Sequence, residues 1–239
     1  MRKFPGFENI YFLSDPLSNR PLRGAIDAKI DTFAITRGEV KTLAPIEVSW
    51  YMGGALPSDF VWTGNAGAVV VHRRVVRLFR DQGFTGWRSY VVSVIDKGGD
   101  YHPEYEGLVI LGRCGPADLS RSAVVISQPQ SEYQVGGTFP QFLGYYFSED
   151  SWDGSDIFME KPDAQGRTTA HVFVTERVRL ALEAARVKNV RFERLTERTV
   201  MTSVYEIGSA YKLPSDLSAR VSAAYSRAGI DPPNHERGG

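Results

Sequence analysis

The sequence predicts an α+β fold with two related strand–helix–strand lobes, an N-terminal β-meander and a C-terminal helix. Three observations support this: short β-rich runs in the first 65 residues, a strand–helix–strand pattern that occurs twice, and an amphipathic helical pattern near the C-terminus. A chain of 239 residues can bury a sizeable core without disulfides or metal. We expect four parts within one compact whole: residues 1–65, 66–127, 128–165 and 166–239.

The N-terminal part consists of short apolar runs separated by turn signals. Residues 10–13 are apolar and are followed by Asp15-Pro16. Residues 28–36 mix β-branched, aromatic and polar side chains, and residues 45–52 alternate until Gly53-Gly54. Strand signals at this regular spacing predict a β-meander.

The first lobe begins with the apolar residues 68–71, which predict a buried strand. Residues 72–82 then have helical spacing, with Val75, Leu78 and Phe79 along one face. Gly83 suits the position after a helix, because glycine enters the left-handed conformation without steric cost. A second strand is expected at residues 88–95, and further strands at residues 107–113 and 122–127.

The second lobe repeats this order. Residues 171–174 predict a strand, Thr175 is a good N-cap, and Val178, Ala181, Leu182 and Ala185 recur at i, i+3, i+4 and i+7. Placing Val71 on Val174 gives an offset of 174 − 71 = 103, and five of twenty positions are then identical between residues 69–88 and 172–191. The pattern indicates a duplication rather than a solenoid, whose period is shorter.

The remaining parts are predicted from turn and helix signals. Residues 128–165 are expected to be a loop and an acidic linker, and residues 200–207 an edge strand. An amphipathic helix is expected over residues 216–228, because it follows Pro214-Ser215 and stops at Gly229.

The bulk composition restricts the class of partner. Lys plus Arg and Asp plus Glu are both 28, so the formal charge is zero, whereas nucleic-acid binders usually carry a basic excess. One cysteine excludes an intramolecular disulfide and fits a reducing compartment. The longest apolar run, residues 66–71, is far shorter than the roughly 20 residues that cross a bilayer. We expect a cytoplasmic protein with no nucleic-acid partner and no membrane partner.

Catalytic signatures are sparse in this sequence. Cys114 has no neighbouring His to lower its pKa, so a small buried or loop cysteine is the simpler interpretation. No zinc-binding spacing and no phosphate-binding glycine motif occurs, and we expect no cofactor. Residues 96–106 concentrate oxygen and imidazole groups, so an alternative hypothesis is a metal-dependent hydrolase that uses Asp100, His102 and Glu104. A solvated loop rich in turn residues is the simpler interpretation there too.

A stronger candidate for binding is the segment 149–163, which holds six acidic residues and one lysine. Aromatic anchors among carboxylates suit a protein-binding surface, especially against a basic partner. The predicted partner contacts are Trp152, Asp153, Asp156 and Glu160, with Asp100 and Glu104 from the loop at residues 96–106. The alternative interpretation is an ordinary acidic loop with core aromatics at its edges.

The two lobes also carry a family resemblance. It rests on Val69-Val70-Val71, Gly83-Phe84-Thr85-Gly86, the linker Asp153-Gly-Ser-Asp156-Ile-Phe158, Val172-Phe-Val174 and Val187-Lys-Asn-Val190. These runs resemble the immunity proteins of polymorphic-toxin systems of the myxobacterial type. The resemblance covers a little over half the chain and leaves out the first sixty residues. It implies a protein that binds a cognate secreted toxin domain, occludes its active or substrate-binding site, and carries no catalytic residues. A related set has paired Cys-x-x-Cys motifs, which are absent here, so no zinc is implied.

Overall fold

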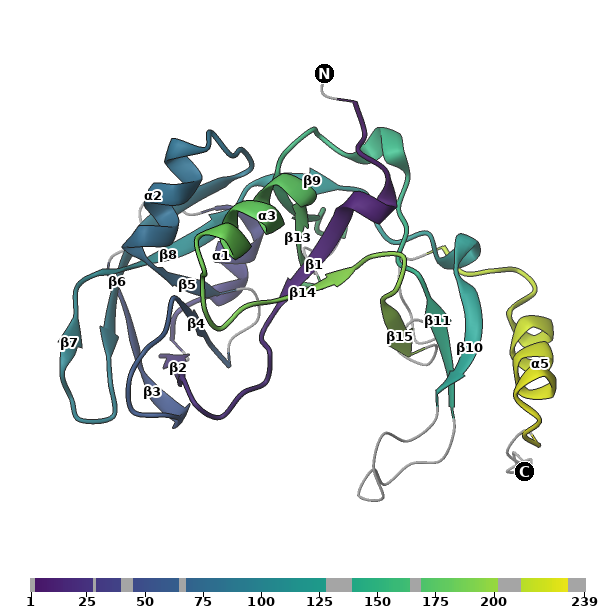
Figure 1. The fold of residues 1–239 in the computed structure, drawn as a ribbon, viewed down its shortest axis with the longest axis horizontal. Helices are drawn as coiled ribbons and strands as arrows, with labels where there is room; N and C mark the ends of the chain where they lie inside the picture. Colours follow the sequence, from purple (N-terminus) through teal and green to yellow (C-terminus); the bar gives the residue numbers. More distant parts are fainter. Residues whose placement is uncertain are drawn as a thin grey trace. The chain divides into compact units, whose positions relative to one another are not determined.

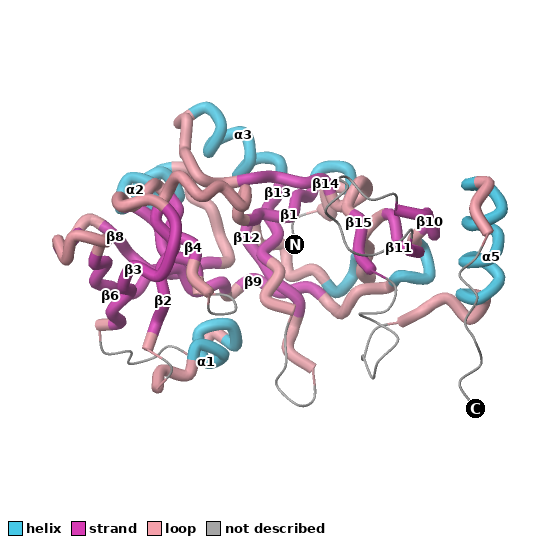
Figure 2. Tube along the Cα trace, turned by 90° about the horizontal axis from the view of Figure 1, so that it is seen from below, coloured by secondary structure: helices cyan, strands magenta, loops and turns pink. Residues whose placement is uncertain are grey.

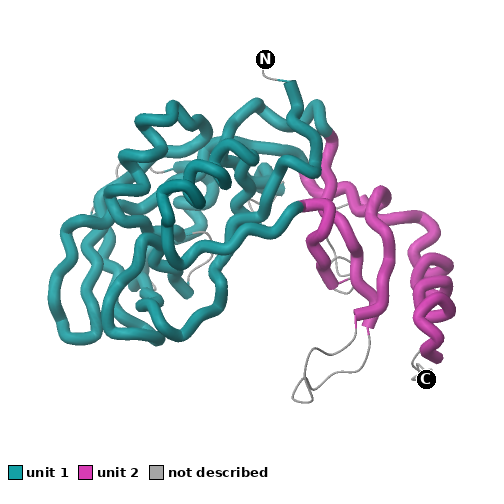
Figure 3. The backbone as a smooth tube through the Cα atoms, viewed as in Figure 1, with its two compact units in different colours: residues 1–115, 149–194 teal, residues 116–148, 195–239 magenta. Residues whose placement is uncertain are grey.

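The computed structural model describes residues 3–27, 29–39, 45–64, 68–127, 139–163, 169–201 and 212–231. The chain forms two compact units: unit 1 comprises residues 1–115 and 149–194, and unit 2 comprises residues 116–148 and 195–239 (Figure 3). The predicted α+β class is confirmed, because strands predominate and four helices occur among the described residues. None of those helices is long and apolar enough to cross a membrane.

Unit 1 holds most of the secondary structure (Figure 1). Its strands are β1 (Ile10–Ser14), β2 (Leu22–Ile26), β3 (Ile46–Gly53), β4 (Phe60–Trp62), β5 (Val69–His72), β6 (Trp87–Ile95), β7 (Tyr101–His102), β8 (Tyr105–Ile110), β9 (Gly112–Cys114), β12 (Ile157–Glu160), β13 (Val172–Thr175) and β14 (Arg191–Arg194). Its helices are α1 (Thr32–Arg37), α2 (Arg73–Asp81) and α3 (Glu176–Ala184), with short 3-10 turns at η1 (Phe7–Asn9) and η3 (Glu149–Ser151).

Six strands of unit 1 form a nearly closed, barrel-like sheet in the order β2-β3-β6-β8-β5-β4, and β7 pairs with β6. The two end strands approach each other at a parallel bridge between Gly24 and Thr63. There the N–H of Gly64 donates to the carbonyl of Gly24 at 3.1 Å. One apolar core belongs to this sheet and consists of Leu22, Ile26, Ile35, Ile46, Val48, Val61, Ala68, Val70, Val92, Val94, Tyr105 and Val109.

The second sheet of unit 1 has the order β14-β1-β13-β12-β9. It shares a second core with α2, α3 and the barrel-like sheet, and this core includes Leu13, Phe60, Phe79, Ile157, Val178 and Leu182. The first three residues of β5 are all apolar because they alternate between the two cores: Val70 belongs to the first, and Val69 and Val71 belong to the second. Each of these valines is fully buried or nearly so, which contributes roughly 1.5–3 kcal/mol per side chain.

The two strand–helix–strand segments have the same strand arrangement. In the first segment, β5 and β6 both run antiparallel to β8, which lies between them. In the second, β13 and β14 both run antiparallel to β1, which lies between them. A preceding antiparallel strand flanks each segment, β4 beside β5 and β12 beside β13. The inserted strand follows the first segment in sequence but precedes the second.

The N-terminal β-meander prediction is wrong. β1 pairs with β13 and β14 rather than with β2, because its apolar face completes the core of the second sheet. Within the predicted strand at residues 28–36 the chain forms helix α1, since the Asp31 carboxylate accepts the N–H groups of Phe33 and Ala34 at 3.0 and 3.3 Å. Gly38 then ends the helix in the left-handed conformation. Strand β2 was not predicted, because Arg23 and Gly24 break its apolar pattern.

The predicted linker at residues 128–165 also needs correction. It contains β11 (Phe139–Leu143) and the buried strand β12, which lies inside the second sheet between β9 and β13. The expected strand at residues 107–113 is divided between β8 and β9. Residues 128–138 and 164–168 lie outside the described residues.

Unit 2 contains a three-stranded sheet in the order β10-β11-β15, with β10 (Ala123–Ser127), β15 (Thr199–Met201), the turn η2 (Leu119–Arg121) and helix α5 (Leu217–Ala228). Helix α5 is confirmed, including its left-handed end at Gly229. It contacts β10, and Arg227 donates to the carbonyl of Val124 at 3.0 Å. The helix therefore belongs to a different unit from the second strand–helix–strand segment. β15 begins where the edge strand was expected, and residues 202–207 lie outside the described residues.

Candidate functional site

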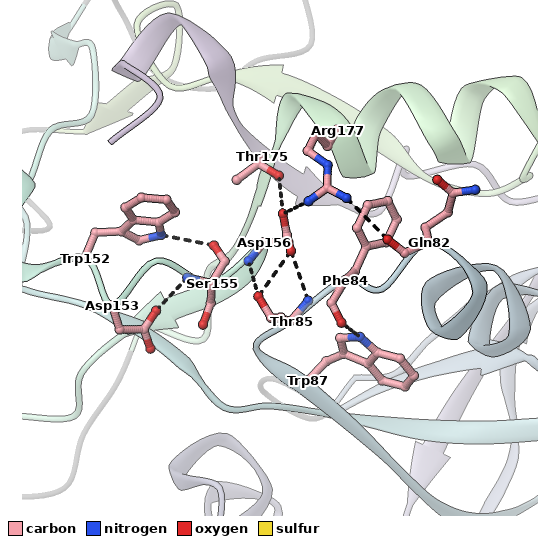
Figure 4. A network of polar contacts seen from close by, with 10 residues as sticks. All are labelled: Gln82, Phe84, Thr85, Trp87, Trp152, Asp153, Ser155, Asp156, Thr175 and Arg177. Carbon is pink, nitrogen blue, oxygen red and sulfur yellow. Dashed lines mark hydrogen bonds and ion pairs between the residues drawn. The ribbon is translucent and has the colours of Figure 1, made fainter. Parts of the chain in front are cut away.

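A dense polar network of unit 1 surrounds Asp156, immediately before β12 (Figure 4). Its side chain is only 1% exposed. The carboxylate accepts the backbone N–H and the hydroxyl of Thr85 at 3.0 and 3.1 Å, and the guanidinium of Arg177 at 3.0 Å. Thr175 adds a longer contact at 3.4 Å. The hydrogen bonds and the cation account for how a carboxylate is held in this interior.

Arg177 connects this carboxylate to the other helix. Its second terminal nitrogen donates to the carbonyl of Gln82, the C-cap of α2, at 3.3 Å. The same guanidinium lies 5.2 Å from the ring centre of Phe84. A cation at the carboxyl end of a helix is favourable, because it faces the negative end of the helix dipole. We call the Asp156–Arg177–Gln82 set the first clamp.

A second clamp has the same design with the helices exchanged. Asp59 stands immediately before β4, and its two carboxylate oxygens accept from Nε and Nη2 of Arg74. Arg74 also donates to the carbonyls of Ala185 and Arg186, at the C-terminal end of α3, at 3.1 and 3.3 Å. The Asp59 carboxylate accepts the backbone N–H of Lys188 at 2.7 Å. Burial opposes ionisation of Asp59, but Arg74 and this N–H outweigh it and hold the pKa of Asp59 below its usual range.

The arginines and the helix ends of the two clamps correspond at the offset of 103 residues, whereas the carboxylates of Asp59 and Asp156 are 156 − 59 = 97 residues apart. Arg74 matches Arg177, Gln82 matches Ala185, and Thr85 matches Lys188. The backbone follows the same correspondence, because residues 83 and 186 both have positive φ, at 62° and 51°, as do residues 86 and 189, at 88° and 61°. Each arginine reaches the end of the other helix, so α2 and α3 are antiparallel neighbours with reciprocal contacts. The identity of the two arginines was the only sequence signal for the clamps.

The structure buries three of the four partner contacts predicted in the acidic segment. Trp152 is 6% exposed and its ring lies 5.7 Å from that of Phe4 and 6.1 Å from that of Phe158. Glu160 is 2% exposed and accepts the hydroxyl of Thr169 at 2.7 Å. Together with Asp156, these side chains are buried and make contacts within the chain's own fold. The alternative interpretation, core aromatics at the edge of an acidic loop, describes this segment better.

The fourth residue, Asp153, is exposed, but its carboxylate is already hydrogen-bonded to backbone groups of the same chain. Its carboxylate accepts the N–H groups of Arg113 at 2.7 Å and Ser155 at 3.0 Å, which closes the turn that leads into β12. Glu149 and Asp150 are exposed beside it. The acidic surface that remains is therefore smaller than the sequence suggests.

The loop at residues 96–106 is ordered around a histidine. The ring nitrogens of His102 lie 3.1 Å from an oxygen of Asp96 and 3.2 Å from an oxygen of Glu104. The hydrogen bond to Asp96 raises the pKa of His102, against a smaller opposing effect of burial, and Glu104 adds to the increase. Asp100 contributes its backbone N–H to Asp96 at 3.0 Å. The two carboxylates lie on opposite sides of the ring, and the described residues contain no group of three side chains placed to hold a metal ion.

Cys114 is fully buried at the end of β9, as the simpler interpretation of the sequence predicts. Burial raises the pKa of its thiol, and the nearby carboxylates of Glu160 and Asp153 act in the same direction. A thiol held neutral in this way is a poor nucleophile.

The accessible surface over α3 contains two depressions that meet at Arg177 and Leu180. One, of about 360 Å³, is lined by Lys3, Trp152 and Asp156 among others. The other, of about 470 Å³, lies between α2 and α3 and is mainly apolar. We call the second the α2–α3 groove and define it by Leu78, Phe84, Arg177, Leu180, Ala181 and Ala184. The groove was not predicted, although Leu180 is an apolar residue outside the buried stripe of the helix and could have indicated it.

Comparison with known proteins gives no direct assignment. No protein-family model matches this chain. A search of curated proteins also found no match. The resemblance to immunity proteins therefore stays a prediction.

Proposed function

We propose that this protein is an immunity protein, which binds a cognate secreted toxin domain in the cytoplasm of the producing cell and occludes its active or substrate-binding site. The family resemblance suggests the class of partner. The observation that carries the proposal is the division of roles in unit 1. The carboxylates of its two clamps are held by arginines of the same unit, whereas an accessible, mainly apolar groove lies between two of its helices.

A binding role fits the chemistry of the polar groups better than catalysis does. A general acid, base or nucleophile has to reach a substrate. Asp156 is enclosed by its donors, Asp59 is held by Arg74 and Lys188, and the thiol of Cys114 is buried. His102 has both ring nitrogens engaged by carboxylates. These contacts favour a scaffold whose surface, rather than its reactive groups, performs the function.

The proposal includes the origin of the scaffold: the two strand–helix–strand lobes are copies of one ancestral segment. Support comes from the matched strand order, the matched positive φ values and the reciprocal clamps. Reciprocal contacts of this kind are those of a two-fold symmetric dimer. Among related sequences, residues at positions 74 and 177 should be conserved together with carboxylates at 59 and 156. Relatives that keep one clamp and vary freely at the other would contradict a shared design.

The direct test is protection of cells. The toxin domain encoded next to this gene would be expressed under an inducible promoter, with and without the full chain, and survival would be counted. A non-cognate toxin domain serves as the control. We expect rescue from the cognate domain alone, together with a complex of the two purified proteins. If no toxin domain from the gene's neighbourhood is bound or neutralised, the proposed function is wrong.

A further inference from the structure

We infer that the α2–α3 groove is the partner-binding surface, and that it takes a protein segment carrying an apolar side chain flanked by carboxylates. This inference rests on the proposed function for the identity of the partner. The recognition chemistry itself follows from the groove. It also reverses the expectation of a basic partner, because two of the acidic residues on which that expectation relied, Asp156 and Glu160, are buried.

The floor and one lip of the groove are apolar. Leu180 is 50% exposed on α3, and Ala181, Ala184 and Leu78 continue the apolar surface across to α2. Phe84 closes the end of the groove and is itself 7% exposed. A half-exposed leucine beside a mainly apolar depression with a volume of about 470 Å³ offers a site for one large apolar side chain. Helices α2 and α3, both labelled in Figure 2, are held together by the two clamps, so the surface between them is preorganised.

The charge of the two helices indicates which groups should flank the apolar side chain of the partner segment. Helices α2 and α3, together with Arg186, carry seven arginines and three carboxylates, in a chain whose total charge is zero. Several arginines are paired, Arg74 and Arg177 in the clamps and Arg73 and Arg80 near Glu106. Two exposed arginines, Arg77 and Arg186, have no carboxylate partner among the residues that the structure describes. These cations favour a partner that supplies carboxylates.

The position of Arg77 follows from the correspondence of the two helices. At the offset of 103 residues, Arg77 of α2 stands where Leu180 stands in α3. Both are exposed; Leu180 lines the groove on α3, and Arg77 on α2 directly precedes Leu78, which also lines it. A partner segment that presents an apolar residue to Leu180 can therefore present a carboxylate to Arg77.

Two other occupants fit less well. A second copy of this chain would bring the same unpaired arginines toward each other, which is unfavourable. Nucleic acid requires accessible aromatic rings or a basic excess over the whole chain, whereas Phe84 is buried and the chain is neutral. An acidic protein segment satisfies both the apolar floor and the exposed cation of Arg77.

The first experiment uses the full chain and its toxin domain. Leu180→Glu should weaken binding by about tenfold or more, because it places a carboxylate on the apolar lip. Arg77→Glu should weaken it by about two- to fivefold and reduce its salt dependence. Matched controls are Leu56→Glu and Arg20→Glu, which line a separate depression of unit 1 and should change binding by less than about twofold. Circular dichroism would verify that all four variants are folded.

The outcomes distinguish the two proposals. If the toxin domain binds and the groove variants bind as well as the wild type, the groove assignment is wrong while the proposed function stands. If no toxin domain binds, the groove is tested alone by NMR of the labelled full chain with a synthetic helical peptide of leucine and glutamate. We expect shifts confined to α2 and α3, and at least tenfold weaker binding of the same peptide with lysine in place of glutamate. Equal binding of the lysine peptide, or tighter binding of single-stranded DNA at these helices, would overturn the inference.

Discussion

Removal of the Asp156 carboxylate tests whether the clamps hold unit 1 together. In Asp156→Ala, the N–H and hydroxyl of Thr85 and the guanidinium of Arg177 lose their shared acceptor in a site that is 1% exposed. Breaking a buried ion pair by removing one partner costs about 3–5 kcal/mol. Arg177 is 54% exposed and can recover water contacts, so the lower end of that range, about 3 kcal/mol, is the expected loss.

The measurement is thermal unfolding followed by near-ultraviolet circular dichroism, which reports on Trp152 and the other aromatic side chains of unit 1. A loss of about 3 kcal/mol corresponds to a fall in Tm of roughly 6–12 °C for a domain of this size. Asp156→Asn keeps an acceptor for Thr85 but loses the charge, and should show about half of that fall. Asp150→Ala, an exposed carboxylate close by in sequence, should change the free energy of unfolding by less than about 0.5 kcal/mol. An Asp156→Ala variant as stable as Asp150→Ala would refute the account of the clamp.

Three further predictions concern other parts of unit 1. His102 has a raised pKa, so its contribution to stability is complete below its ordinary value of 6.5 and is lost as pH rises through the higher folded value; the difference in stability between wild type and His102→Gln should shrink across that interval, and a difference constant from pH 5 to 9 would contradict this. Cys114 should resist alkylation by iodoacetamide in the native protein and react in urea, whereas rapid native reaction would show an accessible thiolate. Gly86→Ala should lower the free energy of unfolding far more than Gly83→Ala does. Both glycines have positive φ, but only at Gly86 would an added Cβ meet a backbone atom, at 2.1 Å. Equal losses of stability in urea unfolding would show that the backbone strain of positive φ, and not this clash, sets the cost.

The fold was predictable where the information is local. Apolar spacing identified β5, α2, β13, α3 and α5, because a helix or strand that buries one face repeats its apolar residues at a fixed period. α1 was missed although its Asp31 N-cap and Gly38 end are readable signals, since six residues carry little periodicity. The insertion of β1 between β13 and β14 depends on contacts across more than 150 residues, and no local pattern encodes it.

The candidate site was predictable only in part, for a physical reason. Carboxylates are usually exposed, so a run of them predicts a charged surface. Asp156 escapes this rule because Arg177, 21 residues away, and Thr85, 71 residues away, supply its donors. Glu160 escapes it because β12 is an interior strand of its sheet. The burial of these groups is set by tertiary partners that the local sequence does not reveal.

The positions at which the two strand–helix–strand segments differ indicate where the binding function lies. Under the proposed duplication, the positions that kept the same role are those of the clamps, where Arg74 and Arg177 still reach across to the end of the opposite helix. Positions that diverged are free of that constraint. Arg77 and Leu180 occupy matched, exposed positions on the two helices that form the groove, yet one is a cation and the other is aliphatic. A purely structural surface gains nothing from that difference, whereas a partner with an apolar residue beside a carboxylate is recognised by it. Exchanging the two residues in Arg77→Leu/Leu180→Arg keeps the composition of the surface and should weaken toxin binding as much as Leu180→Glu does, because the two side chains would then face the wrong parts of the partner.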